Sequence, residues 1–558
     1  MNDAGDIGAK PCGGSSGPGL RRFLAGPSAV FALVFLWRAV LLAGLSLPVP
    51  SNDSFFYDGP VVNFLLHGTY ANPALAPALP ISGTERFCAY PPLYQAALWG
   101  WMAIFGTSVL AAMAFHLVLF GAYLRLLLAS LRRLRVPVWT IRIAGLFLLA
   151  ITFDDRPDSL AHVWGIAAVY AWIRSRPSLG SVGNSPGAWA WVMAILAILT
   201  LATSLQIGAV YCLLIGVGVL AARLVGGDPI PWSAMAVLGV VPVALVAFVA
   251  LHFPRVWAGF LEHARQTPSV SGWRFPKPAE ILKIIRTVPG ILAVTALLPF
   301  ALWDLLVRPR SQDGSAPKTS QPKGLCGDEP SPPLEAWRYA LITTAGLVAP
   351  LAITAAALFV LTPNSVMFAS QLQPLLVATF LALAAANRPN RRALRWQLGL
   401  FLTLAGLASI RAAGLTTWGA ACALNDGCRT SIARVETELQ HCSPGSTVIL
   451  SSPYLYQAAR HPDLRWIHCD WMAPADRHRT DIDWQGLNQL KPARIILTQF
   501  DFYRRFQPLL EELKQHPSLA RFTVVNTATL RTPDSMASLQ KVVQHISWAP
   551  IVVTIQWQ

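Results

Sequence analysis

Charged residues are scarce in this chain. They make up 13% of its 558 residues, whereas an ordinary soluble domain carries about 25%. Long apolar runs recur from residue 28 to about residue 414 and then stop. This composition excludes a simple soluble protein and predicts a large membrane domain followed by a small soluble one.

Acidic residues are scarcer than basic ones, and the formal net charge is +16. Such an excess can indicate binding to nucleic acid. Here, however, the basic residues cluster in connections between apolar runs, at 132–142, 174–176, 308–323 and 388–395. That is the pattern of cytoplasmic loops under the positive-inside rule. We therefore predict membrane lipids as the surroundings and no nucleic-acid partner.

The apolar runs predict about eleven membrane spans, since each crossing needs roughly 20 apolar residues. The predicted spans are 28–48, 108–130, 141–153, 159–173, 188–203, 205–223, 233–253, 291–307, 339–361, 374–387 and 396–413. A further apolar run, 92–106, is ambiguous. With the N-terminus inside, the eleven spans place every basic cluster inside. Counting 92–106 as a twelfth span would place all four clusters outside. We therefore interpret 92–106 as interfacial or re-entrant.

Three parts of the chain follow from this topology. Residues 1–27 are predicted to be a disordered cytoplasmic N-terminus. Residues 28–413 form an all-α polytopic membrane domain, with an outer loop at 49–107 and a cytoplasmic linker at 308–338. Residues 414–558 form a periplasmic α/β domain, because strand-like runs alternate there with helical patterns. The strand-like runs are 446–451, 493–499, 522–526 and 551–555, and the helical patterns are 432–440 and 508–516.

Eight cysteines are present. If the outer compartment is oxidising, Cys422–Cys428 and Cys442–Cys469 are the predicted disulfides. The cysteine spacing does not match a zinc ribbon, so we predict no metal site of that kind.

Carboxylates gather in two connections on the predicted outer side. Asp53 and Asp58 directly follow the first span, and a second group directly follows the third span; its members are Asp154, Asp155 and Asp158, with Arg156 among them. One such acid is ordinarily a solvated helix end. Two clusters on one side, with neighbouring charges that perturb each other's pKa, indicate a functional site.

The motifs around these acids occur in a definite order. They are Asp53-Ser54-Phe55-Phe56-Tyr57, then Asn63-Phe64-Leu65-Leu66-His67-Gly68-Thr69-Tyr70, then Tyr90-Pro91-Pro92-Leu93-Tyr94, and finally Arg156-Pro157-Asp158-Ser159-Leu160. This succession resembles the GT-C glycosyltransferases, and more narrowly the protein mannosyltransferase and aminoarabinose transferase family. The resemblance covers about the first 175 residues by motif and the remainder by layout.

The resemblance implies a polyprenyl-phosphate-linked sugar as donor and an inverting transfer to an outer acceptor, which is a protein, a lipid or a polysaccharide. Asp53 matches the family's base position, with Asp58 as the alternative, because an acceptor hydroxyl needs a carboxylate to take its proton. Asp158 would orient the acceptor, hold Arg156, or help to bind a divalent cation, which stays open as a cofactor.

The leaving lipid phosphate needs cations or hydrogen-bond donors. The candidates are Arg156, Arg255, Arg265, Arg274 and Lys277. The alternative for the 254–290 residues is a basic loop that only contacts anionic headgroups. The candidate substrate contacts are Asp154, Asp155, Tyr57, Tyr90, Tyr94 and Gln371.

Two departures from the family pattern stand out. Aminoarabinose transferases carry a glutamate at the position of Ala89, and many relatives hold an Arg-Tyr pair before a proline where this chain reads 369–374. Other classes therefore stay open: a transporter or lipid-linked sugar flippase, or a non-catalytic scaffold. Within the spans, Arg38 and His116 are expected to face an internal cavity or to pair with each other. Composition and short loops lead us to expect a bacterial inner membrane.

Overall fold

The computed structural model describes most of the chain. The described ranges are 28–47, 52–76, 79–134, 136–149, 156–176, 186–266, 371–386, 392–422, 427–469, 484–515, 520–526 and 546–558, with a few single residues between them. The predicted N-terminal tail 1–27, the linker 308–338 and the span 339–361 lie outside these ranges, as does nearly all of the span 291–307.

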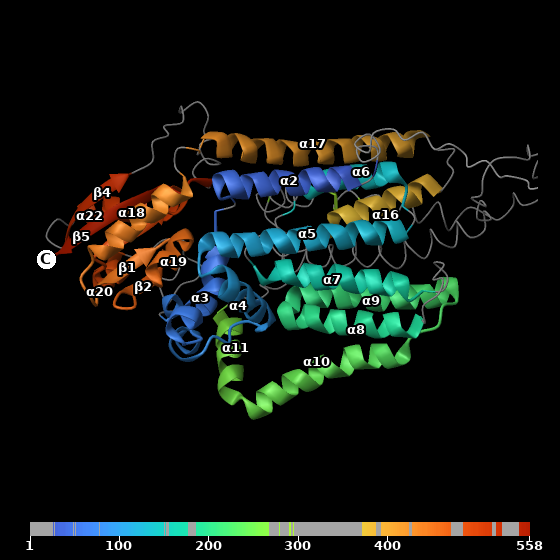
Figure 1. The fold of residues 1–558 in the computed structure, drawn as a ribbon, viewed down its shortest axis with the longest axis horizontal. Helices are drawn as coiled ribbons and strands as arrows, with labels where there is room; N and C mark the ends of the chain where they lie inside the picture. Colours follow the sequence, from blue (N-terminus) through green and yellow to red (C-terminus); the bar gives the residue numbers. More distant parts are fainter. Residues whose placement is uncertain are drawn as a thin grey trace, which may run out of the picture.

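A bundle of helices forms the long part of the molecule (Figure 1). Its members are α2 (Ser28–Leu45), α5 (Val109–Arg133), α6 (Val138–Leu146) with η3 (Phe147–Leu149), α7 (Pro157–Arg174), α8 (Pro186–Thr203), α9 (Leu205–Gly226), α10 (Trp232–His252), α16 (Gln373–Ala386) and α17 (Arg392–Cys422). Each corresponds to a predicted span. Among the described helices, α2, α5, α9 and α10 are long and apolar enough to cross a membrane, and the apolar stretches Val138–Leu149 and Gly187–Thr203 are shorter.

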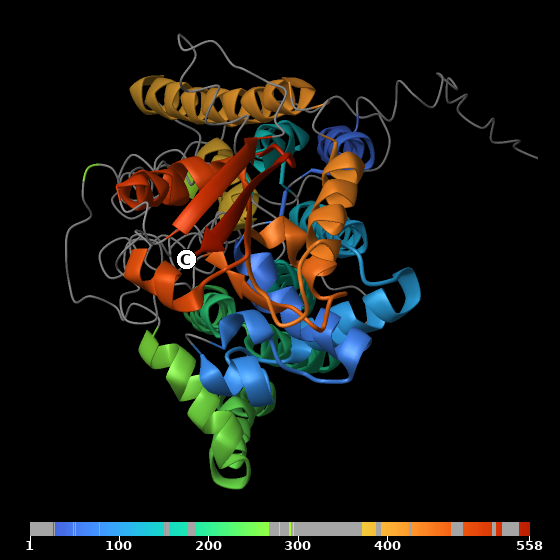
Figure 2. The same ribbon diagram turned by 90° about the vertical axis from the view of Figure 1, so that its left-hand side faces the viewer.

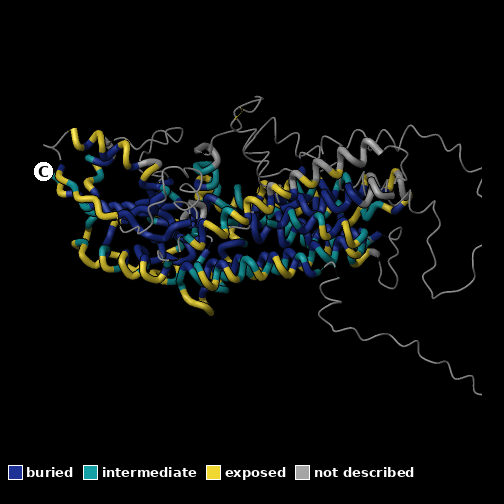
Figure 3. The backbone as a smooth tube through the Cα atoms, turned by 90° about the horizontal axis from the view of Figure 1, so that it is seen from above, coloured by how far each residue is buried: buried dark blue, intermediate teal, exposed yellow. Residues whose placement is uncertain are grey.

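The bundle is apolar on its outside as well as inside. Figure 3 shows buried backbone along its middle and exposed backbone along its edges. The exposed side chains on α10 include Val240, Val243 and Leu251, which are 64%, 69% and 77% exposed. A helix whose apolar residues cover its whole circumference requires an apolar solvent. The multi-pass membrane protein predicted from hydropathy is the fold observed.

Close packing within the bundle depends on small residues. Gly165 on α7 lies against the buried ring of Tyr211 on α9, and a Cβ atom at Gly165 would come within 2.3 Å of that ring. Helices approach each other this closely only where a side chain is absent.

Gly165→Ala is therefore expected to destabilise the bundle by about 1–3 kcal/mol, because the buried ring must move to admit a methyl group. Thermal unfolding in detergent measures the change. Gly216→Ala on α9 is the matched control, since nothing lies within 4 Å of that position. Equal midpoints for the two variants would contradict this account of the α7–α9 contact.

Short helices lie across one end of the bundle. They are α3 (Asn52–His67), η1 (Pro73–Leu75), η2 (Ile81–Glu85), α4 (Leu93–Phe105) and α11 (Pro254–Gln266). Figures 1 and 2 show α3, α4 and α11 grouped at the end that faces the sheet. α4 has 13 residues and lies with α3 and α11 at the end of the bundle, whereas the similarly short α16 runs along the bundle (Figure 1). This agrees with the interfacial interpretation of residues 92–106.

A five-stranded mixed sheet lies beyond these short helices (Figure 2). Its strands are β1 (Thr447–Leu450), β2 (Arg465–His468), β3 (Arg494–Thr498), β4 (Ala520–Asn526) and β5 (Pro550–Trp557), in the order β2-β1-β3-β5-β4. β1 pairs in parallel with β2 and β3, and β5 pairs antiparallel with β3 and β4. The helical elements around it are α18 (Cys428–Gln440), η8 (Ser452–Tyr454), α19 (Leu455–Ala458), α20 (Trp484–Leu490), α21 (Gln499–Asp501), η10 (Phe502–Phe506) and α22 (Gln507–Lys514).

The two faces of the sheet belong to different cores. Val448 and Leu450 join the core that continues into the helical bundle, whereas Ile449 and Ile467 join a second core under α22. Alternation along a strand produces this division. The α/β prediction holds, although β2 was not predicted. Helix α17 also continues to Cys422, beyond the predicted domain boundary at residue 414.

Candidate functional site

Asp58 lies at the junction of the helical bundle and the sheet domain. It is 0% exposed. Tyr94 on α4 donates a hydrogen bond to its Oδ1 at 2.9 Å, and Tyr456 on α19 donates to its Oδ2 at 2.7 Å. Burial raises the pKa of Asp58 to about 7, and the two tyrosine hydrogen bonds offset part of that rise. Because each carboxyl oxygen of Asp58 accepts a hydrogen bond from another element, Asp58 joins α3 to α4 and to α19.

The hydrogen bonds of Tyr94 extend from this joint into the bundle. Its hydroxyl also lies 3.0 Å from Nε2 of His116 on α5. The expected pairing of Arg38 with His116 is not formed. Arg38 instead stacks on the ring of Phe120, at 4.2 Å, and donates to the carbonyl of Ile151.

Asp158 forms a second polar centre at the start of α7. Its Oδ2 lies 3.0 Å from Nε of Arg156, and its Oδ1 accepts a hydrogen bond from Ser204 at 2.8 Å. Asp158 stands in the first turn of α7, where the helix dipole favours a negative charge. Ser204 also caps α9. Asp158 is 5% exposed. The side chain of Arg156 is 27% exposed, so it can contact a ligand.

Aromatic side chains join the two carboxylates. Tyr57, which precedes Asp58 on α3, packs edge-on against Tyr90 at 4.9 Å between ring centroids, and lies 6.5 Å from Tyr94. The hydroxyl of Tyr90 lies 3.0 Å from Oγ of Ser204. A continuous path of contacts, which we call the polar path, therefore runs from Asp58 through Tyr94, Tyr57, Tyr90 and Ser204 to Asp158. The structure thus brings three of the predicted tyrosines together with Asp58 and Asp158, the two predicted site aspartates whose side chains are described.

Several predicted site residues fall where little is described. Asp53 stands in the first turn of α3, four residues before Tyr57, and its side chain lies outside the described residues. The side chain of Arg265, on α11, does so too. Three further site residues and one further phosphate candidate lie wholly outside: Asp154, Asp155, Lys277 and Arg274.

Arg255 and Gln371 both contact other parts of this protein. Arg255 is 70% exposed and forms a two-pronged ion pair with Glu85 of η2, with Nε 2.8 Å from Oε2. The guanidinium holds the pKa of Glu85 below its usual value. This pairing satisfies the cation with a carboxylate in place of a phosphate. Gln371, just before α16, is 6% exposed, and its backbone carbonyl accepts a hydrogen bond from the Tyr123 hydroxyl.

Neither predicted disulfide is formed. Cys422, Cys428 and Cys442 are free thiols. Cys442 donates to the carbonyl of Glu438 and packs against the core shared with the bundle, whereas Cys469 belongs to the core on the other face of the sheet. Two cysteines on opposite faces of a sheet cannot approach to disulfide distance. Cys428 is buried in the shared core, while Cys422 ends α17 at the periphery.

Four residues of this region were not predicted as site residues. Ser204 could have been noticed as a helix cap after an apolar run. His116 stood out as a polar residue within a span but was expected to contact Arg38. Tyr456 is 398 residues away from Asp58 in the sequence. The ring of His263 on α11 lies 5.1 Å from that of Phe56. Neither of these last two contacts leaves a local signal.

Among the described residues, no group of three His, Cys, Asp or Glu side chains lies close enough to hold a metal ion.

The arrangement of bundle, crossing helices and terminal sheet has been seen before. The crystal structure of ArnT from Cupriavidus metallidurans bound to undecaprenyl phosphate matches with a TM-score of 0.50 at 15% sequence identity. The match covers 94% of this chain and 97% of ArnT. The fold is GT-C. The likeness extends the resemblance of the first 175 residues over nearly the whole chain.

Two further structures match at lower TM-scores. The apo state of the same ArnT matches with a TM-score of 0.41 at 14% identity, over 94% of this chain and 98% of that one. The archaeal oligosaccharyltransferase AglB from Archaeoglobus fulgidus, in complex with an inhibitory peptide and a dolichol-phosphate, matches with a TM-score of 0.45 at 10% identity. The match covers 86% of this chain and 70% of AglB. No family model and no curated protein matches the sequence.

Proposed function

We propose that the chain is a membrane glycosyltransferase that moves a sugar from a polyprenyl-phosphate donor to an acceptor at the outer face of a bacterial inner membrane. One observation carries the proposal. In a GT-C fold, the end of the bundle beneath the sheet gathers acidic and aromatic side chains from the segment after α2 and from the start of α7, joined through Tyr57, Tyr90 and Ser204.

The proposed chemistry is a single displacement. The acceptor oxygen attacks the anomeric carbon from the face opposite the phosphate, so the configuration inverts. The bond from the carbon to the phosphate oxygen breaks, and its electron pair leaves with the polyprenyl phosphate. The acceptor proton passes to a carboxylate, for which we propose Asp53, one turn before Tyr57 on α3. Such a base is needed because the hydroxyl is a weak nucleophile at neutral pH.

Arg156 is the proposed partner of the donor phosphate. It is the one phosphate candidate whose described side chain is both part of the polar path and partly exposed. Asp158 lies 3.0 Å from its Nε, and a guanidinium group is the side chain best suited to phosphate oxygens because it can donate two parallel hydrogen bonds. Asp158 therefore acts in the proposal as a positioning residue for Arg156.

Binding of undecaprenyl phosphate tests this assignment directly. Native mass spectrometry of the purified full chain is expected to detect one bound lipid, with Arg156→Gln weakening it about 10- to 100-fold, because a charge-assisted hydrogen bond contributes about 1.5–3 kcal/mol.

Arg174→Gln is the matched control, because Arg174 stands in the last turn of α7, the opposite end from Arg156, where it stacks on Trp189. Binding that is equally weakened by both changes would refute a specific role for Arg156. A chain that binds no undecaprenyl phosphate at all would count against the function itself.

A further inference from the structure

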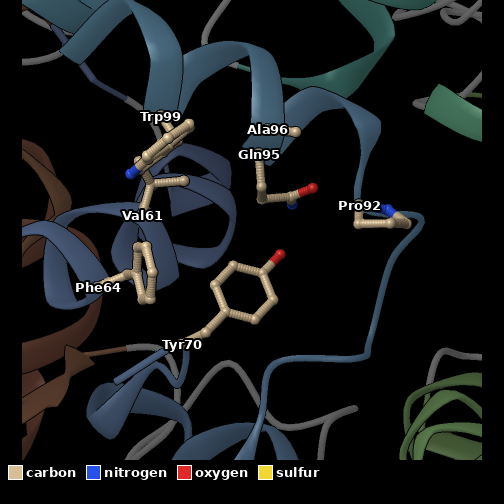
Figure 4. Close-up of a pocket in the computed structure, with 7 residues that line it drawn as sticks. All are labelled: Val61, Phe64, Tyr70, Pro92, Gln95, Ala96 and Trp99. Carbon is tan, nitrogen blue, oxygen red and sulfur yellow. The ribbon is translucent and has the colours of Figure 1, made fainter. Parts of the chain in front are cut away.

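A cavity of about 330 Å³ lies between α3 and α4, apart from the polar path. Its volume is at the lower end of the range for small-molecule sites, about 300–1,000 Å³. Figure 4 shows Trp99, Val61 and Phe64 along one side of the cavity, Gln95, Ala96 and Pro92 along the other, and the ring of Tyr70 between them.

The walls of the cavity are almost entirely apolar, and no charged side chain lines it among the described residues. Phe64 and Trp99, 6.4 Å apart between ring centroids, are 40% and 45% exposed. An exposed tryptophan on a helix too short to span fits the boundary between hydrocarbon and headgroups. The cavity therefore opens at the depth of the membrane interface.

Two polar groups inside the cavity have no hydrogen-bond partner in the described part of the chain. They are the carboxamide of Gln95, at both its nitrogen and its oxygen, and the hydroxyl of Tyr70. Gln95 is 1% exposed, and Figure 4 shows its amide and the Tyr70 hydroxyl turned toward one another. An unsatisfied buried polar group costs about 1–3 kcal/mol, so native proteins nearly always supply a partner.

The chemistry of that partner follows from these groups. Both can donate a hydrogen bond, neither carries a charge, and the rest of the wall is hydrocarbon. A phosphate or an ammonium group would lose its hydration there without gaining a counter-charge. A neutral acceptor attached to an apolar chain fits, and at the membrane interface that combination is the ester carbonyl of a glycerophospholipid.

We infer that this cavity binds one ester-linked glycerophospholipid of the outer leaflet, with its ester carbonyl held by Gln95 and Tyr70 and its acyl chain against Phe64 and Trp99. The lipid would brace α3 against α4. Because the neighbouring Tyr94 bonds Asp58, the brace supports the helix pair that carries the polar path. This inference does not depend on the proposed transferase activity.

The test compares two lipids that differ only in the carbonyl groups. Native mass spectrometry of the purified full chain measures the affinity for a diester phosphatidylethanolamine and for its diether analogue. The diester is expected to bind about five- to tenfold more tightly, since one neutral hydrogen bond contributes about 1 kcal/mol and a second adds part of that. Equal affinities would overturn the inference.

Four variants separate the pocket from its surroundings. Gln95→Leu replaces the amide by hydrocarbon of roughly similar volume and is expected to abolish the preference for the diester. Tyr70→Phe, which keeps the ring, is expected to reduce it. Ala96→Trp fills the cavity and is expected to remove the bound lipid. Gly100→Ala on the same helix, where nothing lies within 4 Å, is expected to change nothing.

Thermal unfolding checks that each variant is folded. If Gln95→Leu is not folded, the diester preference of Tyr70→Phe tests the inference. An undiminished preference for the diester in Gln95→Leu or in Tyr70→Phe would overturn the inference. So would an unchanged lipid stoichiometry in Ala96→Trp, because the occupant would then be water or a sugar.

Discussion

Asp53→Asn is expected to reduce sugar transfer about 10²- to 10⁴-fold, which is the usual contribution of a general base. Asparagine has the size of aspartate and cannot take a proton from the acceptor. The measurement is transfer of a labelled sugar from undecaprenyl phosphate in membranes that contain the natural acceptors. Binding of undecaprenyl phosphate is expected to stay unchanged, because the proposed phosphate contact is Arg156.

Asp58→Asn is the matched control, since it makes the same chemical change five residues further along α3. The buried Asp58 carboxyl is occupied by Tyr94 and Tyr456, so transfer by this variant is expected to remain within about tenfold of the wild type. That is well short of the loss of a base. If Asp58→Asn abolished transfer while Asp53→Asn did not, the base would be Asp58 and the proposal would be wrong. Loss of undecaprenyl phosphate binding in Asp53→Asn would instead indicate a structural role.

The contact between the sheet domain and α3 is expected to weaken as the pH rises from about 4 to about 7. Burial raises the pKa of Asp58 to about 7, whereas an exposed aspartate has a pKa of about 3.9. Below about pH 4 the carboxyl is protonated in both the docked and the separated state, so protonation favours neither. Between the two pKa values only the docked state keeps the proton, so stability falls as the pH rises. Above about pH 7 both states are ionised and the loss is complete.

The slope of this change is about 1.4 kcal/mol per pH unit at most for a single group. Hydrogen exchange of the segment around Tyr456 between pH 5 and pH 8 measures the docking, with faster exchange expected at the higher pH after correction for the intrinsic rate. Asp58→Asn is expected to remove the pH dependence, and Tyr456→Phe to weaken docking while leaving the dependence in place. Docking that grows tighter with rising pH would contradict the assignment.

Much of the membrane domain could be predicted because its signal is local. Hydropathy over some 20 residues locates a span wherever the rest of the chain lies, and the described helices follow the predicted spans. Residues 92–106, which the count of basic loops led us to interpret as interfacial or re-entrant, contain the short helix α4 at the end of the bundle (Figure 1). The strand β2 (Arg465–His468) was missed because its two apolar residues stand between an arginine and a histidine, whereas the equally short β1 is an apolar run.

Contacts between distant elements could not be predicted in the same way. The two disulfide predictions rested on proximity in sequence, but Cys442 and Cys469 lie on opposite faces of the sheet. The suggested pair of Arg38 and His116 failed because each side chain found a different neighbour on an adjacent helix, Phe120 for the first and Tyr94 for the second. Helices α2 and α5 do meet, since Phe120 lies on the same helix as His116, but spacing in the chain does not say which side chains of the two helices face each other.

The amino-acid sequence alone determined that this protein crosses the membrane many times, that its C-terminal part contains an α/β unit, and that Asp53, Asp58 and Asp158 follow the ends of predicted spans. Hydrophobicity and helix punctuation are properties of short segments, so they can be interpreted without the fold. Only the tertiary structure decided that Asp58 is a buried joint closed by Tyr456 while Asp158 holds a partly exposed Arg156. Burial and hydrogen-bond partners depend on which side chains meet across the whole chain, and those set what each carboxylate can do.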